Sequence, residues 1–144
     1  MEALLTLTGN IGTNIEYTSG ESWAFARFRV ATTPRIFRKG DWGDAETSWT
    51  AVKCTNRLAE NVASSCSKGD PVIITGRLRT SSWMDASGQR HERMVLEATS
   101  VGHDMARGTT AFTRNERLRS EPPEEPTDWT GLENEDDSVD DQSA

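Results

Sequence analysis

Residues 48–80 read SWTAVKCTNRLAENVASSCSKGDPVIITGRLRT, and this stretch decides the fold. Its first part, Ser48–Thr55, alternates side chains in the manner of a β-strand. Residues 57–67 follow with helical spacing, and Pro71–Thr80 is again β-prone, with Gly76 as a predicted bulge. The stretch therefore predicts a strand, one short helix and a second strand, in that order.

This helix is the only one for which the sequence shows clear helical spacing. Leu58, Val62 and Cys66 recur every four residues and give it one apolar side. Gly69 and Pro71 then end it, because glycine suits a helix terminus and proline prevents its continuation.

The segment before this stretch, Ser22–Thr32, alternates well and predicts a strand with two different faces. The face that suits a core carries Ala24, Ala26, Phe28 and Val30. The opposite face carries Trp23, Phe25, Arg27 and Arg29. That second face suits a surface that needs both aromatic rings and positive charge.

The remaining segments complete a small sheet. Ala3–Thr8 predicts an opening strand, Pro34–Glu46 a long hairpin loop, Asp85–Gly88 a hairpin turn and His91–Val101 a closing strand. Three strands, a helix and two strands predict an all-β fold: a five-stranded antiparallel Greek-key barrel of the OB type, with the helix between strands 3 and 4. Closure protects the edges of so small a sheet.

Charge divides the chain into a basic body and an acidic tail. All 16 Lys and Arg residues lie between Arg27 and Arg119, whereas residues 120–144 contain 10 of the 23 acidic residues and no base. We expect a folded OB domain over residues 1–108 and a disordered acidic tail over residues 120–144. Residues 109–119 are either a connector or an extra strand near Thr110–Thr113.

Several function classes have little support in the sequence. It contains no apolar run of about 18 residues that would span a membrane, and it begins with a strand pattern in place of a signal peptide. Cys54 and Cys66 lack metal-site spacing, and His91 and His103 lie in no known catalytic motif. The sequence therefore predicts no enzyme, no metal and no cofactor. The sequence leaves open whether the two cysteines form a disulfide.

Aromatic residues form the first candidate binding set. An unstacked base offers a π-face whatever its identity, so aromatic platforms bind nucleic acid without sequence preference. Trp49 and Trp83 are the strongest candidates, Phe37 is the next, and Trp42 and Trp23 are balanced between a surface role and a core role.

Basic residues form the second candidate set, for contacts with phosphates. The strongest members are Arg29, Arg35, Arg38, Lys53, Arg77 and Arg79, and the wider set adds Arg27, Lys39, Arg57, Arg90 and Arg93. Such rows can follow a nucleic-acid backbone. For any single residue, an ordinary solvated face is an equally good interpretation.

Taken in order, these segments resemble the bacterial single-stranded DNA-binding protein family. The resemblance covers roughly residues 3–108 and rests on motifs in the family's order and spacing. They are Leu7–Gly12, Phe28–Thr33, Ser48–Val52, Leu58–Val62, Lys68–Val72, and Gly76–Thr80 followed by Trp83. Ser100–Asp104 and the Arg38–Gly43 loop resemble the actinobacterial branch of the family. The sequence as a whole looks like a secondary paralogue in that branch.

The resemblance implies a cytoplasmic, nucleoid-associated homotetramer of OB folds that binds single-stranded DNA in replication, recombination and repair. It assigns base stacking to Trp49 and Trp83. Phe37 stands where the family often has another stacking tryptophan, and Thr55 stands where many members have a stacking phenylalanine. One platform is therefore missing and another reduced, and Trp42 or Trp23 are the candidates for compensation.

The tail departs from the family pattern. Family tails end in an apolar tip that docks on replication and repair proteins, whereas this chain ends Gln142-Ser143-Ala144. Trp129 and Leu132 are the nearest substitute for a partner site, so partner recruitment is expected to be weakened.

Two alternatives to DNA binding stay open at this point. One is an RNA-binding OB module, since stacking and charge serve both nucleic acids. The other is an oligomerising scaffold with reduced nucleic-acid affinity.

Overall fold

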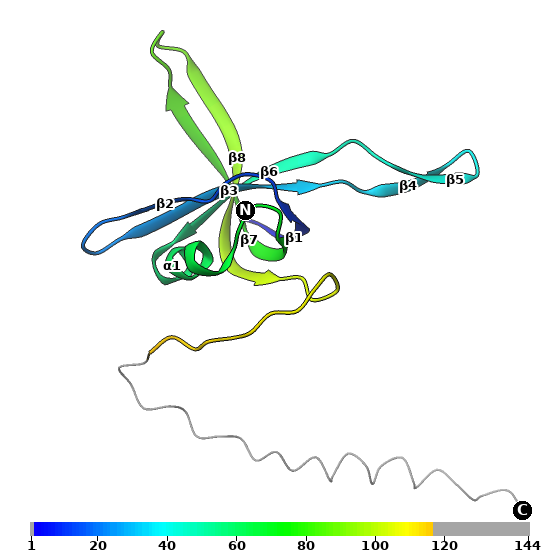
Figure 1. The fold of residues 1–144 in the computed structure, drawn as a ribbon. Helices are drawn as coiled ribbons and strands as arrows, with labels where there is room; N and C mark the ends of the chain where they lie inside the picture. Colours follow the sequence, from blue (N-terminus) through cyan, green and yellow to red (C-terminus); the bar gives the residue numbers. More distant parts are fainter. Residues whose placement is uncertain (1, 117–144) are drawn as a thin grey trace, which may run out of the picture. The chain divides into compact units, whose positions relative to one another are not determined.

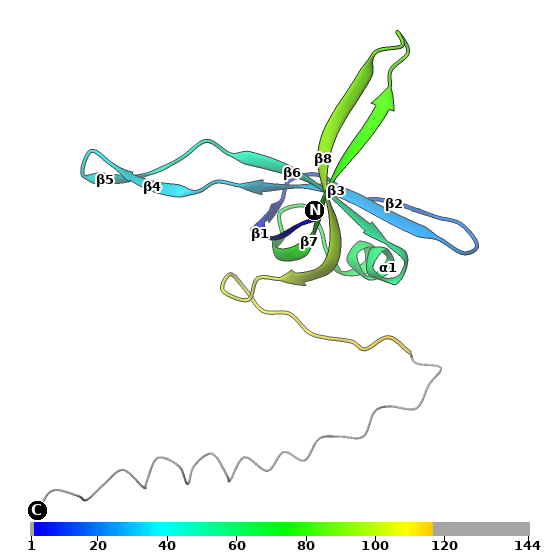
Figure 2. The same cartoon turned by 180° about the vertical axis from the view of Figure 1, so that it is seen from behind.

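A computed structural model describes residues 2–116 (Figures 1 and 2). Its elements in chain order are β1 (Ala3–Ile11), β2 (Glu16–Ser19), β3 (Ala24–Thr32), β4 (Arg35–Arg38), β5 (Asp41–Asp44), β6 (Ser48–Thr55), α1 (Asn56–Ser65), β7 (Pro71–Met84) and β8 (Arg90–His103). The predicted strand–helix–strand order of residues 48–80 is confirmed.

Five of these strands close into a barrel. The hydrogen-bonded order is β1-β7-β8-β6-β3, and a pairing of β1 with β3 completes the circle, while β2 adds to the outer side of β3. The predicted five-stranded barrel is confirmed, but its description as wholly antiparallel is wrong. β6 and β8 pair in parallel over three residue pairs, Ala51–Lys53 against Val95–Glu97. Parallel strands require a crossover connection, and α1 with β7 supplies it here.

The core consists of the inward faces of these strands and one side of the helix. Ala24, Ala26, Phe28 and Val30 of β3 are all buried, as their alternation predicts. Ala59 and Val62 bring α1 into the same cluster, whereas Leu58 and Cys66 pack at its margin. The alternating pattern of residues 22–32 therefore predicts the orientation of β3 correctly. The face that carries the aromatic and basic side chains points outward.

Three hairpins project from the barrel (Figures 1 and 2). The segment predicted as a long loop is instead a two-stranded ribbon, β4–β5, with Lys39 and Gly40 at positive φ in its turn. β7 and β8 also continue beyond their predicted bounds, to Met84 and from Arg90. Residues 80–94 form this outer part, called the β7–β8 arm below.

Glycines permit two close backbone approaches in the barrel. A Cβ on Gly9 would lie 2.6 Å from the carbonyl oxygen of Ala31, where β1 crosses from β7 to β3. A Cβ on Gly76 would collide with the Glu97 carbonyl, and the β7–β8 register shifts at this residue. The irregularity predicted at Gly76 is thus confirmed, but the residue that the register skips is Thr99 of β8.

The compact unit that contains the barrel extends through Thr110. Within residues 104–116 the structure has no strand, so of the two interpretations of residues 109–119 the extra strand near Thr110–Thr113 is wrong. The predicted disordered tail, with Trp129 and Leu132, lies outside the described residues. In the part of the chain that the structure describes, no helix has the length and apolar character needed to cross a membrane.

Candidate nucleic-acid interface

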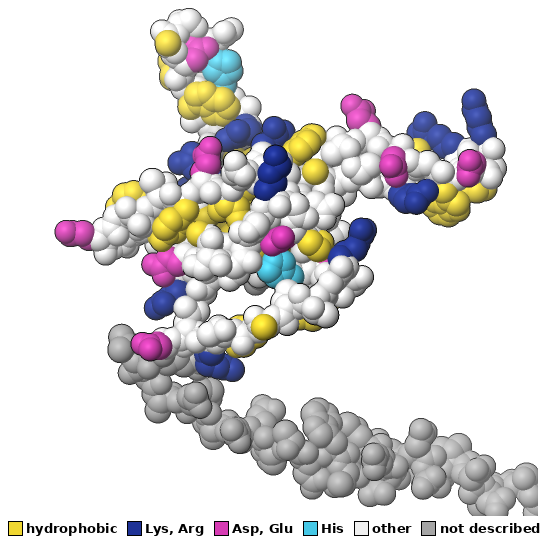
Figure 3. Space-filling model, viewed as in Figure 1, with side chains coloured by type: hydrophobic (Ala, Val, Ile, Leu, Met, Phe, Trp, Pro, Cys, Tyr) yellow, Lys and Arg dark blue, Asp and Glu magenta, His cyan; other side chains and the backbone are white. Residues whose placement is uncertain are grey.

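A groove of about 690 Å³ lies between the outward faces of β3 and β6 and the base of the β7–β8 arm. Its walls carry five basic side chains, namely Arg27, Arg29, Lys53, Arg79 and Arg93, and two acidic ones, Glu16 and Glu97. In Figure 3, dark-blue basic side chains gather where the arm meets the barrel. The groove is therefore a basic channel on the side of the barrel.

Three of these cations lie over aromatic rings. The distances from cation to ring centroid are 5.0 Å for Arg29 over Trp49, 4.7 Å for Lys53 over Phe25, and 5.5 Å for Arg93 over Trp83. Among residues 2–116, no carboxylate lies within ion-pair distance of Arg27, Arg29, Lys53 or Arg93. Cations without an ion-pair partner thus line the groove, and three of them lie against aromatic rings beside it. This combination suits a strand of bases and phosphates.

Trp49 is the second residue of β6 and lies opposite Ala31 of β3, at one end of this face. About half of its surface is exposed (48%). Its six-membered ring lies directly over Gly12, and a Cβ at that position would collide with it. Gly12, directly after β1, therefore leaves space for the Trp49 ring.

Gly12→Ala is expected to displace the Trp49 ring and weaken binding of oligo-dT, at most by the value of one stacked base, about 1–3 kcal/mol. Fluorescence anisotropy with labelled oligo-dT measures the loss. Gly102→Ala is the matched control, because a Cβ at Gly102 meets no atom within 4 Å. Equal affinity of the Gly12→Ala variant and the parent would show that the ring position does not matter.

Trp83 lies on the β7–β8 arm, opposite His91 of β8. The two rings stack with centroids 5.4 Å apart and an interplanar angle of 19°. His91 in turn lies 2.6 Å from Asp85, measured from Nε2 to Oδ2. Hydrogen bonds from the Ser87 hydroxyl, from His91 and from the Gln89 backbone hold the pKa of Asp85 far below its ordinary value. The hairpin turn thus holds one face of the Trp83 ring against His91, while 46% of the residue's surface stays exposed.

Phe25 and Trp23 form a further aromatic pair on β3 and the turn before it. Their ring centroids are 5.4 Å apart at 37°. Phe25 pairs directly with Thr55 across β3 and β6. An aromatic ring, with Lys53 over it, therefore lies one strand away from residue 55, where the family resemblance places a stacking platform. Phe25 was not among the predicted site residues, although its place on the outward face was a usable signal.

Phe37 and Trp42 lie elsewhere, on the β4–β5 ribbon. They are cross-strand partners with centroids 5.4 Å apart at 59°, and both are more than half exposed. Arg38 is on the same ribbon, and Arg35 lies 3.8 Å from Asp44 there. None of these four residues lines the groove, so the predicted site is divided between the groove and the ribbon.

Arg77 and Arg79 are less available than the sequence predicts. Both lie within ion-pair distance of Glu2, and Arg79 also hydrogen-bonds Glu97 at 3.0 Å. Only Arg79 lines the groove. Arg27 and Arg93, members of the wider basic set, line the groove and have no carboxylate within ion-pair distance among residues 2–116.

Comparison with known proteins gives these features a context. The model of the family described as "Single-strand binding protein family" matches residues 4–104. The single-stranded DNA-binding protein 2 of Streptomyces avermitilis is 39% identical over 115 residues, which are 78% of this chain and 72% of that protein. The single-stranded DNA-binding protein 1 of Streptomyces coelicolor is 33% identical over 132 residues, 89% of this chain and 84% of that protein.

Solved structures agree with this match. The crystal structure of the small single-stranded DNA-binding protein from Streptomyces coelicolor superposes with a TM-score of 0.65 at 32% identity, covering 75% of this chain and 99% of that one. The second single-stranded DNA-binding protein of Mycobacterium smegmatis gives a TM-score of 0.54 at 27% identity, covering 81% and 100%. With its OB barrel, its motifs and a match over residues 4–104, the chain belongs to the single-strand binding protein family.

Proposed function

We propose that this protein binds single-stranded DNA without sequence preference, through the groove between β3, β6 and the β7–β8 arm. The pairing of rings with groove cations carries the proposal. The exposed Trp49 and Trp83 and the half-buried Phe25 each lie beneath a basic side chain that lines the groove. Bases stack on the rings, and the cations contact phosphates. The names of its relatives support the same ligand.

Competition between matched oligonucleotides tests the ligand class. Oligo-dT and mixed-sequence DNA of one length are expected to compete equally for the groove, because stacking does not read base identity. RNA of the same sequence is expected to compete less well than DNA. An RNA preference would replace this proposal with the RNA-binding alternative, since readout of the 2′-hydroxyl favours RNA.

We further propose that the protein acts as a homotetramer in replication, recombination or repair, at the nucleoid. Leu4, Leu5 and Ile73 on the adjacent strands β1 and β7 are exposed apolar side chains, which supports self-association at this part of the barrel. Sedimentation equilibrium of the full chain distinguishes a tetramer from smaller species.

Binding is expected to weaken as salt increases, because phosphate contacts release counterions. Four unpaired groove cations predict a slope of log affinity against log salt of about −3 per protomer, at about −0.7 for each contact. Lys53→Gln combined with Arg93→Gln should make the slope shallower by about 1.4.

The matched control for the salt series is Arg57→Gln. Arg57 is on α1, pairs with Glu60 at 3.9 Å and does not line the groove. The slope of log affinity against log salt for the Arg57→Gln variant should equal that of the parent. If the double variant also keeps the parent slope, phosphates do not bind in the groove.

A further inference from the structure

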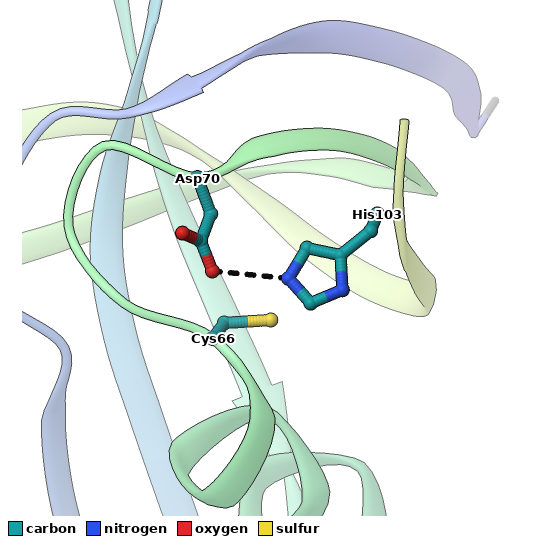
Figure 4. A group of neighbouring side chains, drawn as sticks. All are labelled: Cys66, Asp70 and His103. Atoms are coloured by element: carbon teal, nitrogen blue, oxygen red, sulfur yellow. Dashed lines mark hydrogen bonds and ion pairs between the residues drawn. The ribbon is translucent and has the colours of Figure 1, made fainter. Parts of the chain in front are cut away.

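Three potential metal ligands from distant parts of the sequence meet at one end of the barrel (Figure 4). Cys66 is the C-cap of α1, Asp70 lies in the turn before β7, and His103 is the last residue of β8. Their ligand atoms, one from each side chain, all lie within 4.8 Å of one another. The thiol, carboxylate and imidazole point toward a common space in Figure 4.

The spacing of these atoms can be compared with that of a tetrahedral zinc site. Zinc binds sulfur at about 2.3 Å and nitrogen or oxygen at about 2.0–2.2 Å, which places neighbouring ligand atoms about 3.4–3.6 Å apart. In the structure, His103 Nε2 and Asp70 Oδ2 are 3.0 Å apart. This pair would widen by a few tenths of an ångström around an ion. The Cys66 sulfur, within 4.8 Å of both atoms, would approach to about 3.5 Å.

The backbone around the cluster is fixed on several sides. The Ser67 amide donates to Asp70 Oδ2 at 3.0 Å, and the Asp70 amide donates back to the Ser67 carbonyl. The Ile11 amide of β1 donates to the Asp70 carbonyl at 2.9 Å, and the Asp104 amide donates to Pro71 at 3.0 Å. The ligands are thus held by three strands and the helix end, and little chain ordering is needed on binding.

The cluster is also accessible. Cys66, Asp70 and His103 are all half-buried, with 24% of the His103 side chain and 32% of the Asp70 side chain exposed. An ion held by three protein ligands keeps a fourth position for water in such a setting. A thiolate and an imidazole select zinc or a related transition metal over magnesium or calcium, which prefer oxygen ligands alone.

We propose that Cys66, Asp70 and His103 bind one Zn²⁺ per chain, with water as the fourth ligand. The ion would join the end of α1, the start of β7 and the end of β8, and binding would release the thiol proton. A nucleophilic cysteine is the competing interpretation of a Cys–His–Asp group. An activated nucleophile needs its base within hydrogen-bond reach of the thiol, whereas Nε2 of His103 is hydrogen-bonded to Asp70 Oδ2 at 3.0 Å.

Cobalt titration of the full chain under reducing conditions tests the proposal, because a thiolate ligand gives Co²⁺ an intense charge-transfer absorption. We expect one equivalent to produce this band, and one equivalent of Zn²⁺ to abolish it. Cys66→Ser should lose the band, and His103→Gln should bind at least about tenfold more weakly. The control Cys54→Ala should keep it, because Cys54 is fully buried and outside the cluster.

Thermal unfolding with and without Zn²⁺ gives a second measurement that does not depend on the cobalt spectrum. A ligand that binds the folded state raises Tm, so Zn²⁺ should raise it for the parent and for Cys54→Ala but not for Cys66→Ser or His103→Gln. Absence of the band in the parent, or an equal Tm increase in all four proteins, would overturn the proposal. Oligo-dT binding by each variant verifies that it is folded.

Discussion

The variant carrying both Trp49→Ala and Trp83→Ala is expected to bind oligo-dT about 2–6 kcal/mol more weakly than the parent, a loss of roughly 30-fold or more. Each ring is about half exposed and lies beneath an arginine, so each supplies one stacking surface beside one positive charge. The rings lie on different elements, β6 and the β7–β8 arm. Their effects should therefore add to a good approximation.

Fluorescence anisotropy at one fixed salt concentration measures this loss. Met84→Ala is the matched control, since Met84 is exposed and adjoins Trp83 in sequence but carries no ring. Replacement of both tryptophans by phenylalanine should restore most of the affinity. If the double alanine variant binds within about threefold of the parent, the rings are not the platforms.

Leu96→Ala is expected to reduce the free energy of unfolding by about 2–5 kcal/mol. Leu96 is completely buried, and β8 pairs there with both neighbours, opposite Val52 of β6 and Leu78 of β7. The truncation therefore opens a cavity where the parallel pairing closes the barrel. Chemical denaturation at one fixed protein concentration measures the change.

The control for this stability measurement is Met105→Ala, since Met105 is 71% exposed and should change stability by less than about 0.5 kcal/mol. A loss below about 1 kcal/mol for Leu96→Ala would mean that this contact is not central to the core.

Much of the barrel could be predicted because half-buried strands leave a period of two in the sequence. Residues 22–32 show this most clearly, and every predicted inward residue of β3 is buried. The helix was equally visible, since Val62 and its neighbours recur with helical spacing. The β4–β5 ribbon was not, because Asp41–Asp44 is exposed throughout and such a strand leaves no alternation to detect.

The candidate site was predictable where local pattern determines it. Trp49 and Trp83 lie beside the groove cations as expected, and the Trp83–His91 stack follows from counting back across the hairpin turn. Contacts between distant segments left no such signal. The pairing of Arg77 with Glu2 depends on a register between strands that lie far apart in the sequence.

The same limit applies to the metal cluster. Cys66 and Asp70 are close together in the sequence, but His103 comes near them only because β8 ends beside the turn before β7. The sequence has no spacing typical of a metal site from which the proximity of these three residues could be predicted.

The central claim is that exposed tryptophans beside the groove stack on the bases of single-stranded DNA. It is tested most directly by titrating the full chain with poly-dT while following tryptophan fluorescence at low salt. Stacking on Trp49 and Trp83 predicts strong quenching that saturates, diminishes in either single alanine variant and reverses as salt is added. Unchanged tryptophan fluorescence at saturating poly-dT and low salt would contradict the account.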